Sequence, residues 1–401
     1  MKTLPESPSI DHLRRQAKDL LSQLRLARPG TTLAEAQSAL AETYGFRAWN
    51  DLKAEAGRLR ADAVAAPDGD AATVAAAFDL GAVASPMTPL HHRGMAKDWS
   101  LTTATGRWLV SELHEWADAR YVDAGVELME AAAKAGVEVP RPVRTRDGDV
   151  VATIDGRRWR VSEWVDMGPE PIKPISEAIA ASVGSTLGKL HALGLPTELP
   201  VNPWLLRRPS AEQLHDLSTR ANAAGMAWAP MVGAALPTLF DLATIGDGTS
   251  DGELVLAHCS LTPESVRLSH GDGLLVLDWE YAGPLAPRWE LGSTLVQWCT
   301  GLGDYSRYAE DDLDAGAARA LASAYGREVE RASSSRDGRD LGMFTIAITG
   351  YLNWVASRVN WAIPHEHSHP IEQQRAEAEL PRLLSKLLSR AMLERLLEAV
   401  R

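Results

Sequence analysis

The pattern of apolar residues changes near residue 83, and this change most constrains the fold. From there to about residue 165 the apolar runs are short and separated by turn signals, as between 99–103 and 107–110, which flank Gly106. One helical segment, about 118–134, interrupts these runs. Beyond residue 170 apolar residues recur at helical spacing, apart from one β segment at 264–280. This order predicts an α+β chain with a small sheet-containing lobe followed by a larger, mainly helical lobe.

The two predicted lobes are 83–168 and 169–401. In the first, Val150–Ile154 and Arg158–Val165 read as strands joined by an Asp155-Gly156 turn. In the second, Ile179, Val183, Leu187 and Leu190 form the stripe of a helix that closes at Gly194. Further helices are expected at 211–224, 231–245, 290–300, 312–330, 340–362 and 371–399.

Residues 1–60 predict a separate module of three helices. The first, 9–26, has one apolar stripe, and the second begins at a capping box, Thr32 to Glu35. The third, about 47–59, carries Trp49 and Leu52. The turn from Tyr44 to Leu52 resembles that of a small helical module fused to various bacterial enzymes. An Ala-, Asp- and Gly-rich stretch, 61–82, is interpreted as a linker that ends with room for a short helix.

Charge and composition limit the classes of function. A net charge of −12 argues against bulk nucleic-acid binding, which needs a basic surface. The apolar runs are too short to span a membrane, and the first residues lack the apolar core of a signal peptide. Two cysteines do not make a disulfide framework, so a reducing, cytoplasmic location is expected.

Residues 258–266 read His-Cys-Ser-Leu-Thr-Pro-Glu-Ser-Val, and the β segment that follows ends in Asp278-Trp279-Glu280. These residues resemble the "HGDLHPGN…IDWE" signature of the aminoglycoside phosphotransferase and choline kinase-like family. The resemblance extends over about 85–401 and implies a two-lobe, protein kinase-like fold. It also implies ATP and Mg²⁺ as cofactors if the chain is active.

Two positions of that signature hold unusual residues. In the family the third residue is an Asp that orients the attacking hydroxyl, and the eighth is an Asn that binds Mg²⁺. Here they are Ser260 and Ser265. The metal-binding Asp is kept as Asp278, eighteen residues after Ser260, so the resemblance implies Asp278 and Ser265 as the metal positions. His258 matches the motif histidine, whose role is structural, and Glu290 matches an acidic residue that braces the loop.

The positions that bind the nucleotide in the family also carry unusual residues. The phosphate loop, 89–98, contains one glycine, and Ser111 stands where the family carries a phosphate-binding Lys. Lys97 is the candidate for supplying that charge from the loop. The nucleotide-binding candidates are Arg93, Gly94, Lys97, Ser111 and Glu163.

Glu280, Trp298, Trp354 and Trp361 are the candidates for the substrate cleft. The tryptophans suit a pocket wall and lobe packing equally well. The alternating histidines of 365–369 fit an exposed loop better than a metal site, because they lack the spacing of helical ligands.

Three interpretations stay open. Loss of the orienting Asp, the Lys and the Asn together favours a pseudokinase that binds a small molecule or nucleotide between the lobes. Such a protein would engage a protein partner through the N-terminal module. The second is an active phosphotransferase for an antibiotic or hydroxylated metabolite that uses Asp278 and Lys97. The third is different chemistry in the same cleft. Ser260 as a nucleophile beside His258 is conceivable, but no Gly-x-Ser-x-Gly elbow surrounds it.

Overall fold

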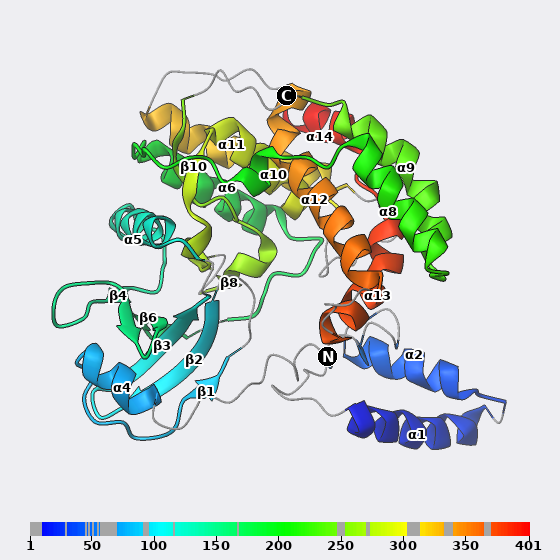
Figure 1. Ribbon diagram of the computed structural model, residues 1–401, viewed down its shortest axis with the longest axis horizontal. Helices are drawn as coiled ribbons and strands as arrows, with labels where there is room; N and C mark the ends of the chain where they lie inside the picture. Colours follow the sequence, from blue (N-terminus) through cyan, green and yellow to red (C-terminus); the bar gives the residue numbers. More distant parts are fainter. Residues whose placement is uncertain are drawn as a thin grey trace.

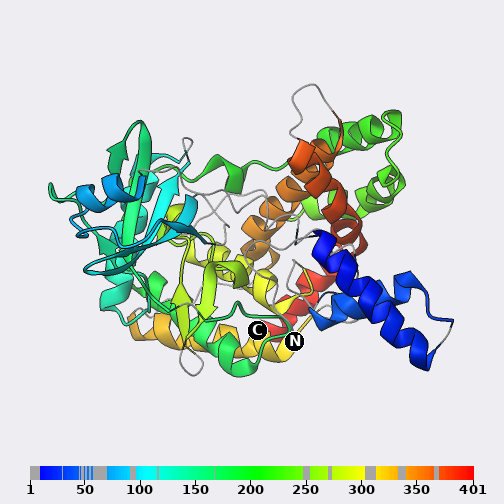
Figure 2. The ribbon, with the colours of Figure 1, turned by 90° about the horizontal axis from the view of Figure 1, so that it is seen from below.

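The computed structural model describes residues 10–28, 30–44, 46, 49, 52–53, 56, 70–90, 96–114, 117–166, 168–246, 253–269, 273–302, 313–332, 340–364 and 370–401. Two lobes are visible in Figure 1: one contains the sheet, and the other is a larger assembly of helices. A pair of N-terminal helices lies beside the helical lobe, at the end distant from the sheet (Figure 2).

The N-terminal pair consists of α1 (Ile10–Ala27) and α2 (Leu33–Thr43). The predicted capping box is confirmed, because the Thr32 N–H donates to Glu35 Oε2 at 2.6 Å and the Glu35 N–H donates to Thr32 Oγ1 at 3.3 Å. Leu13, Leu40 and Leu52 are buried in a core of their own. Most of the third predicted helix, 47–59, lies outside the described residues.

The small lobe is built on one antiparallel sheet. In the order β1-β2-β3-β6-β4, with β5 paired to β6, every described pairing is antiparallel. The predicted hairpin at Gly106 and the turn at Asp155-Gly156 are both present, and the turn residues adopt positive φ. The strands are β1 (Thr88–Pro89), β2 (Ala96–Thr103), β3 (Gly106–Leu113), β4 (Pro142–Val143), β5 (Ala152–Ile154) and β6 (Arg157–Glu163).

One face of this sheet packs against α4 (Asp70–Ala77). Trp99, Val110 and Val161 meet Val74 and Phe78 in a buried cluster. An ion pair between Arg157 and Asp70 adds to this contact. Helix α4 lies inside the stretch interpreted as a linker, so the second half of that stretch packs into the small lobe.

The opposite face of the sheet is turned toward α5 (Ala119–Lys134) and the large lobe. Ala96 and Leu113 pack with Ala117 and Val122 near the start of α5. Helix α5 in turn lies close to the large lobe, since a Cβ on Gly125 would stand 2.1 Å from the carbonyl oxygen of Trp279. The same face of the sheet carries Arg160, which contacts Glu280 of the large lobe.

The large lobe is a helical core with two small β-ribbons. Helices α6 and α11 pack closely because Gly184 carries no side chain: a Cβ there would lie 2.0 Å from the Leu321 carbonyl oxygen. The helices are α6 (Glu177–Ala192), α7 (Pro203–Leu206), α8 (Ala211–Ala223), α9 (Ala229–Ala243), α10 (Pro287–Cys299), α11 (Ala315–Ala332), α12 (Thr345–Ala362), α13 (Pro370–Ser385) and α14 (Arg390–Val400).

Two predictions for this lobe need correction. The single helix expected over 371–399 is two helices, because Ser389 begins α14 by accepting the Met392 N–H at 3.2 Å. The predicted β segment at 264–280 holds the ribbon of β8 (Val266–Leu268) and β9 (Leu274–Val276), with the short 3₁₀ turns η1 (Pro263–Ser265) and η2 (Trp279–Tyr281) beside it. A second ribbon, β7 (Val255–Ala257) with β10 (Gly283–Leu285), was not predicted; each strand has three residues, too few to show alternation.

Across the described residues, none of the helices combines the length and apolar character that a membrane crossing requires.

Candidate functional site

The loop after β7 is held by a buried histidine. His258 Nε2 lies 2.8 Å from the Leu277 carbonyl oxygen, and the Ser260 N–H donates to His258 Nδ1 at 3.3 Å. The ring meets Trp279 edge-on, with 4.9 Å between the ring centroids. Burial lowers the pKa of His258, so the neutral ring is favoured. This agrees with the expected structural role, and it leaves neither ring nitrogen free to act as a base for Ser260.

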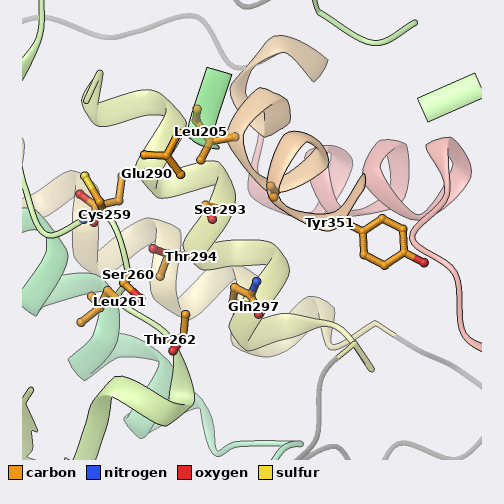
Figure 3. Close-up of a pocket in the computed structure, with 13 residues that line it drawn as sticks. Leu205, Cys259, Ser260, Leu261, Thr262, Glu290, Ser293, Thr294, Gln297 and Tyr351 are labelled. Atoms are coloured by element: carbon orange, nitrogen blue, oxygen red, sulfur yellow. Dashed lines mark hydrogen bonds between the residues drawn. The ribbon is translucent and has the colours of Figure 1, made fainter. Parts of the chain in front are cut away.

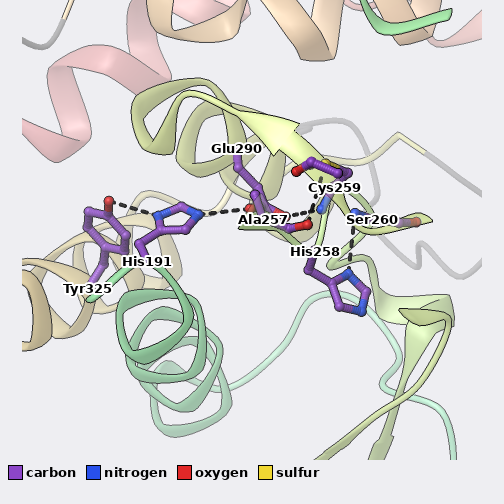
Figure 4. Close-up of polar contacts among 8 residues, drawn as sticks. His191, Ala257, His258, Cys259, Ser260, Glu290 and Tyr325 are labelled. Atoms are coloured by element: carbon purple, nitrogen blue, oxygen red, sulfur yellow. Dashed lines mark hydrogen bonds and ion pairs between the residues drawn. The ribbon is translucent and has the colours of Figure 1, made fainter. Parts of the chain in front are cut away.

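A buried chain of polar contacts also holds the same loop (Figure 4). Cys259 adopts a left-handed φ of 62°, and its N–H donates to Glu290 Oε1 at 2.6 Å. Glu290 Oε2 lies 2.8 Å from His191 Nε2, and His191 Nδ1 lies 3.0 Å from the Tyr325 hydroxyl. Glu290 therefore contacts the loop as expected. His191 and Tyr325 were missed, because they lie on α6 and α11, far from the loop in sequence, and no local pattern marks them.

The Ser265 hydroxyl makes its hydrogen bonds within the loop. The side chain is fully buried, and its hydroxyl lies 2.6 Å from the Ser260 carbonyl oxygen and 3.0 Å from that of Thr262. The same oxygen accepts the Thr262 N–H at 2.9 Å. The hydroxyl thus faces its own turn, η1. Ser260, by contrast, is half-buried and lines a small cavity.

Asp278 lies across from this turn in a left-handed conformation, with a φ of 59°. Burial and the charges of Glu280 and Asp98 raise its pKa well above the usual range, while Arg267 opposes them. In the described part of the chain no group of three His, Cys, Asp or Glu side chains is arranged to hold a metal ion. Because Ser265 is engaged elsewhere, the residues do not fit the two-ligand Mg²⁺ site that the resemblance implies.

A row of polar residues crosses the face of the sheet that is turned toward the large lobe. Strand register aligns Asp98 on β2 with Ser111 on β3, and Ser111 with Arg160 on β6. The Ser111 hydroxyl donates to Asp98 Oδ1 at 2.6 Å, so the position of the family lysine carries a neutral donor bonded to a carboxylate. Burial raises the pKa of Asp98 to about 6, against the hydrogen bond from Ser111.

The nearest buried cation in this row lies one strand away. Arg160 pairs through Nη2 with Glu280, and the two residues are 7% and 5% exposed. Sequence reasoning missed both Arg160 and Asp98. The loop was expected to run through residue 98, whereas β2 begins at Ala96, so their shared row emerges only from the strand register.

Lys97 lies on the other face of the sheet. It stands opposite Glu112 in the register, with 3.9 Å between Nζ and Glu112 Oε2, and its side chain is 43% exposed. Side chains alternate along a strand, so Lys97 is directed away from Ser111. Glu163 is exposed at the end of β6, opposite Trp108. Arg93 and Gly94 lie outside the described residues, as does the histidine stretch 365–369.

A cavity of about 160 Å³ lies between the loop, α10 and α12 (Figure 3). Most of its polar lining consists of hydroxyls and one amide, from Ser260, Thr262, Ser293, Thr294 and Gln297.

The three candidate tryptophans are not among the residues that line this cavity. Trp298 is fully buried behind the loop and donates to the Leu261 carbonyl oxygen at 2.8 Å. Trp354 packs against the lobe core. Trp361 is 42% exposed, with the Arg358 guanidinium 5.0 Å from its ring centroid. The structure therefore does not gather them around one pocket.

Comparison with known proteins identifies relatives that are phosphate-transferring enzymes. The model of the phosphotransferase enzyme family matches residues 92–333. Homoserine kinase of Rhodopseudomonas palustris (strain TIE-1) is 28% identical over 218 residues, which cover 51% of this chain and 58% of that protein. Homoserine kinase of a Bradyrhizobium species is 30% identical over 204 residues, or 50% and 57% of the two chains. The match thus spans somewhat over half the length of these relatives.

Two solved structures share the fold. An amicoumacin kinase in complex with AMP-PNP, Ca²⁺ and Ami has a TM-score of 0.52 at 15% identity, over 79% of this chain and 94% of that one. An aminoglycoside phosphotransferase from Alicyclobacillus acidocaldarius has a TM-score of 0.51 at 15% identity, over 84% and 97%. At such identities the likeness concerns the fold alone.

Proposed function

The chain belongs to the phosphotransferase enzyme family, and from this premise we propose that it is a catalytically impaired member that binds a ligand between its lobes. The observation that carries the proposal is the hydrogen bonding of the loop. The Ser265 hydroxyl contacts the Ser260 and Thr262 carbonyl oxygens. Ser260 provides no carboxylate at the position where the family carries the orienting Asp.

Each changed position removes a separate part of phosphoryl transfer. A hydroxyl such as that of Ser260 stays protonated near neutral pH and is a poor acceptor for a substrate proton. Ser111 brings no positive charge to a phosphate, and its hydroxyl already donates to Asp98. Burial and the charges of Glu280 and Asp98 raise the pKa of Asp278, and both effects disfavour its charged form. Losses of this kind act on one transition state, so one remaining group does not restore the rate.

The scaffold of the site is nevertheless intact. His258, Glu290 and Trp298 all hold the backbone of the loop in place. A braced loop with altered reactive positions suits ligand binding better than turnover.

The proposal is tested by measuring ADP formation and ligand binding in the same preparations. We expect ATP turnover at the background rate, unchanged in Ser260→Ala and Asp278→Asn. We also expect saturable binding of a nucleotide or phosphate ligand by thermal shift. Turnover that falls tenfold or more in either variant would overturn the assignment as an impaired member.

A second candidate, an active phosphotransferase, is favoured by one observation. Asp278 keeps its family position and, in the described part of the chain, its carboxylate accepts no hydrogen bond. Lys97 does not support this candidate, because it lies on the other face of the sheet. A Mg²⁺-dependent thermal shift with ATP that Asp278→Asn abolishes, together with turnover on an alcohol substrate, would favour it.

A further inference from the structure

The guanidinium of Arg160 is buried, and two of its nitrogens have no hydrogen-bond partner among the described residues. The residue is 7% exposed, and Nη2 contacts Glu280. Nε and Nη1 are both buried and have no hydrogen-bond partner in the part of the chain that the structure describes. Buried N–H groups are nearly always paired, and an unpaired charged donor is costly.

We propose that Arg160 is a ligand-binding residue of the cleft, and that its free N–H groups bind an oxyanion of a phosphate-bearing ligand. This inference rests on the proposed function, since it presupposes a ligand between the lobes. It places the cation for that ligand on β6, one strand from the family lysine position at Ser111. Neighbouring strands lie about 4.8 Å apart, and a long arginine side chain covers that offset.

The chemistry around Arg160 favours an anion with several oxygens. Nε and Nη1 point from different edges of the planar group, so a single lone pair does not satisfy both. The same sheet face carries the buried hydroxyls of Ser100, Ser111 and Ser162. A phosphate offers three acceptor oxygens and pairs well with a guanidinium.

Negative charges nearby set the strength of this site. Arg160 lowers the pKa of Asp98 and Glu280 raises it, so the three side chains lie close together. Asp278 lies in the same cluster, because the charge of Asp98 raises its pKa. Arg267 contributes a second positive charge toward Asp98 and Asp278. The negative charge of Asp98 therefore repels a bound anion, and removal of that charge should tighten anion binding.

The test measures the affinity of the full chain for inorganic phosphate, ADP and adenosine by calorimetry. Replacing Arg160 alone leaves Glu280 buried without a partner and risks unfolding, so the main variant is Arg160→Gln/Glu280→Gln. We expect it to weaken ADP binding by about tenfold or more, the effect of losing hydrogen bonds to a charged group. Asp98→Asn, which keeps an acceptor for Ser111, should tighten binding.

Lys97→Gln is the matched control, because it removes one cation from the same sheet on the opposite face; its affinity should stay within about twofold of the unmodified chain. Binding of phosphate and ADP would assign the site to the phosphate group itself, and binding of ADP alone to a nucleotide. Equal ADP affinity in the double variant and the unmodified chain would overturn the inference. So would adenosine binding as tightly as ADP, or no binding of phosphate or ADP. ADP-forming turnover that depends on Ser260 would refute the proposed function and leave the role of Arg160 standing.

Discussion

The guanidinium of Arg160 pairs with the carboxylate of Glu280, and this ion pair joins strand β6 of the small lobe to the η2 turn of the large lobe. Both side chains are nearly fully buried. Residues 120 positions apart in the sequence thus connect the sheet to the η2 turn. Arg160 stands in the same cross-strand row as Ser111 and Asp98.

This geometry predicts strong coupling between the two residues. Arg160→Gln or Glu280→Gln alone leaves one buried charge without a partner and should destabilise the fold by about 3–5 kcal/mol. The double substitution should cost clearly less than the sum of the two. Urea unfolding of the four proteins measures the coupling energy, and additive losses would show that the pair contributes nothing as a pair.

Ser265 should matter for stability through its hydroxyl. Ser265→Ala leaves the Thr262 N–H without its acceptor inside the loop, so we expect a loss of about 1–3 kcal/mol in the free energy of unfolding. The control is Ser260→Ala, a half-buried hydroxyl in the same loop, with an expected effect within about 0.5 kcal/mol. If both variants unfold at the same urea concentration as the unmodified chain, Ser265 does not close the loop.

Asp98 predicts a dependence of stability on pH. Its pKa is raised to about 6 in the fold, from an ordinary value near 3.8. The folded state therefore binds the proton more tightly than the unfolded state, so this contribution is complete below about pH 4 and is lost as pH rises through 6. Asp98→Asn should then raise the melting temperature more at pH 7.5 than at pH 4.5. A difference that does not change with pH would show that Asp98 titrates normally.

Gly184 should not tolerate a methyl group. In Gly184→Ala the new Cβ meets the Leu321 carbonyl oxygen at 2.0 Å, so α6 and α11 must separate, and we expect a loss of about 3 kcal/mol or more. Gly326 on α11 is the matched control, since a Cβ there has no heavy atom within 4 Å. Gly326→Ala should stabilise the helix by about 0.5–1 kcal/mol. Thermal unfolding of both variants measures the contrast, and equal melting temperatures would refute the close packing.

Much of the local structure followed from the sequence alone. The hairpin at Gly106, the capping box at Thr32 and the turn at Asp155 were all predicted correctly. Each depends on residues within a few positions of one another, whose backbone preferences and hydrogen bonds are short-range. The frame from His258 to Asp278 likewise indicated the family that the match over 92–333 confirms.

Which charged side chains lie together in the site was decided by the tertiary structure. Whether Lys97 or Asp98 faces the cleft depends on where β2 begins, and a shift of one residue exchanges the two faces of a strand. Arg160 gained its role only when β6 paired with β3 and the lobes brought Glu280 against it. The sequence by itself determined most of the longer elements and the family, because these arise from local periodicity and motif spacing. Only the tertiary structure decided which charged groups meet, because their pairing depends on strand register and on contacts between distant segments.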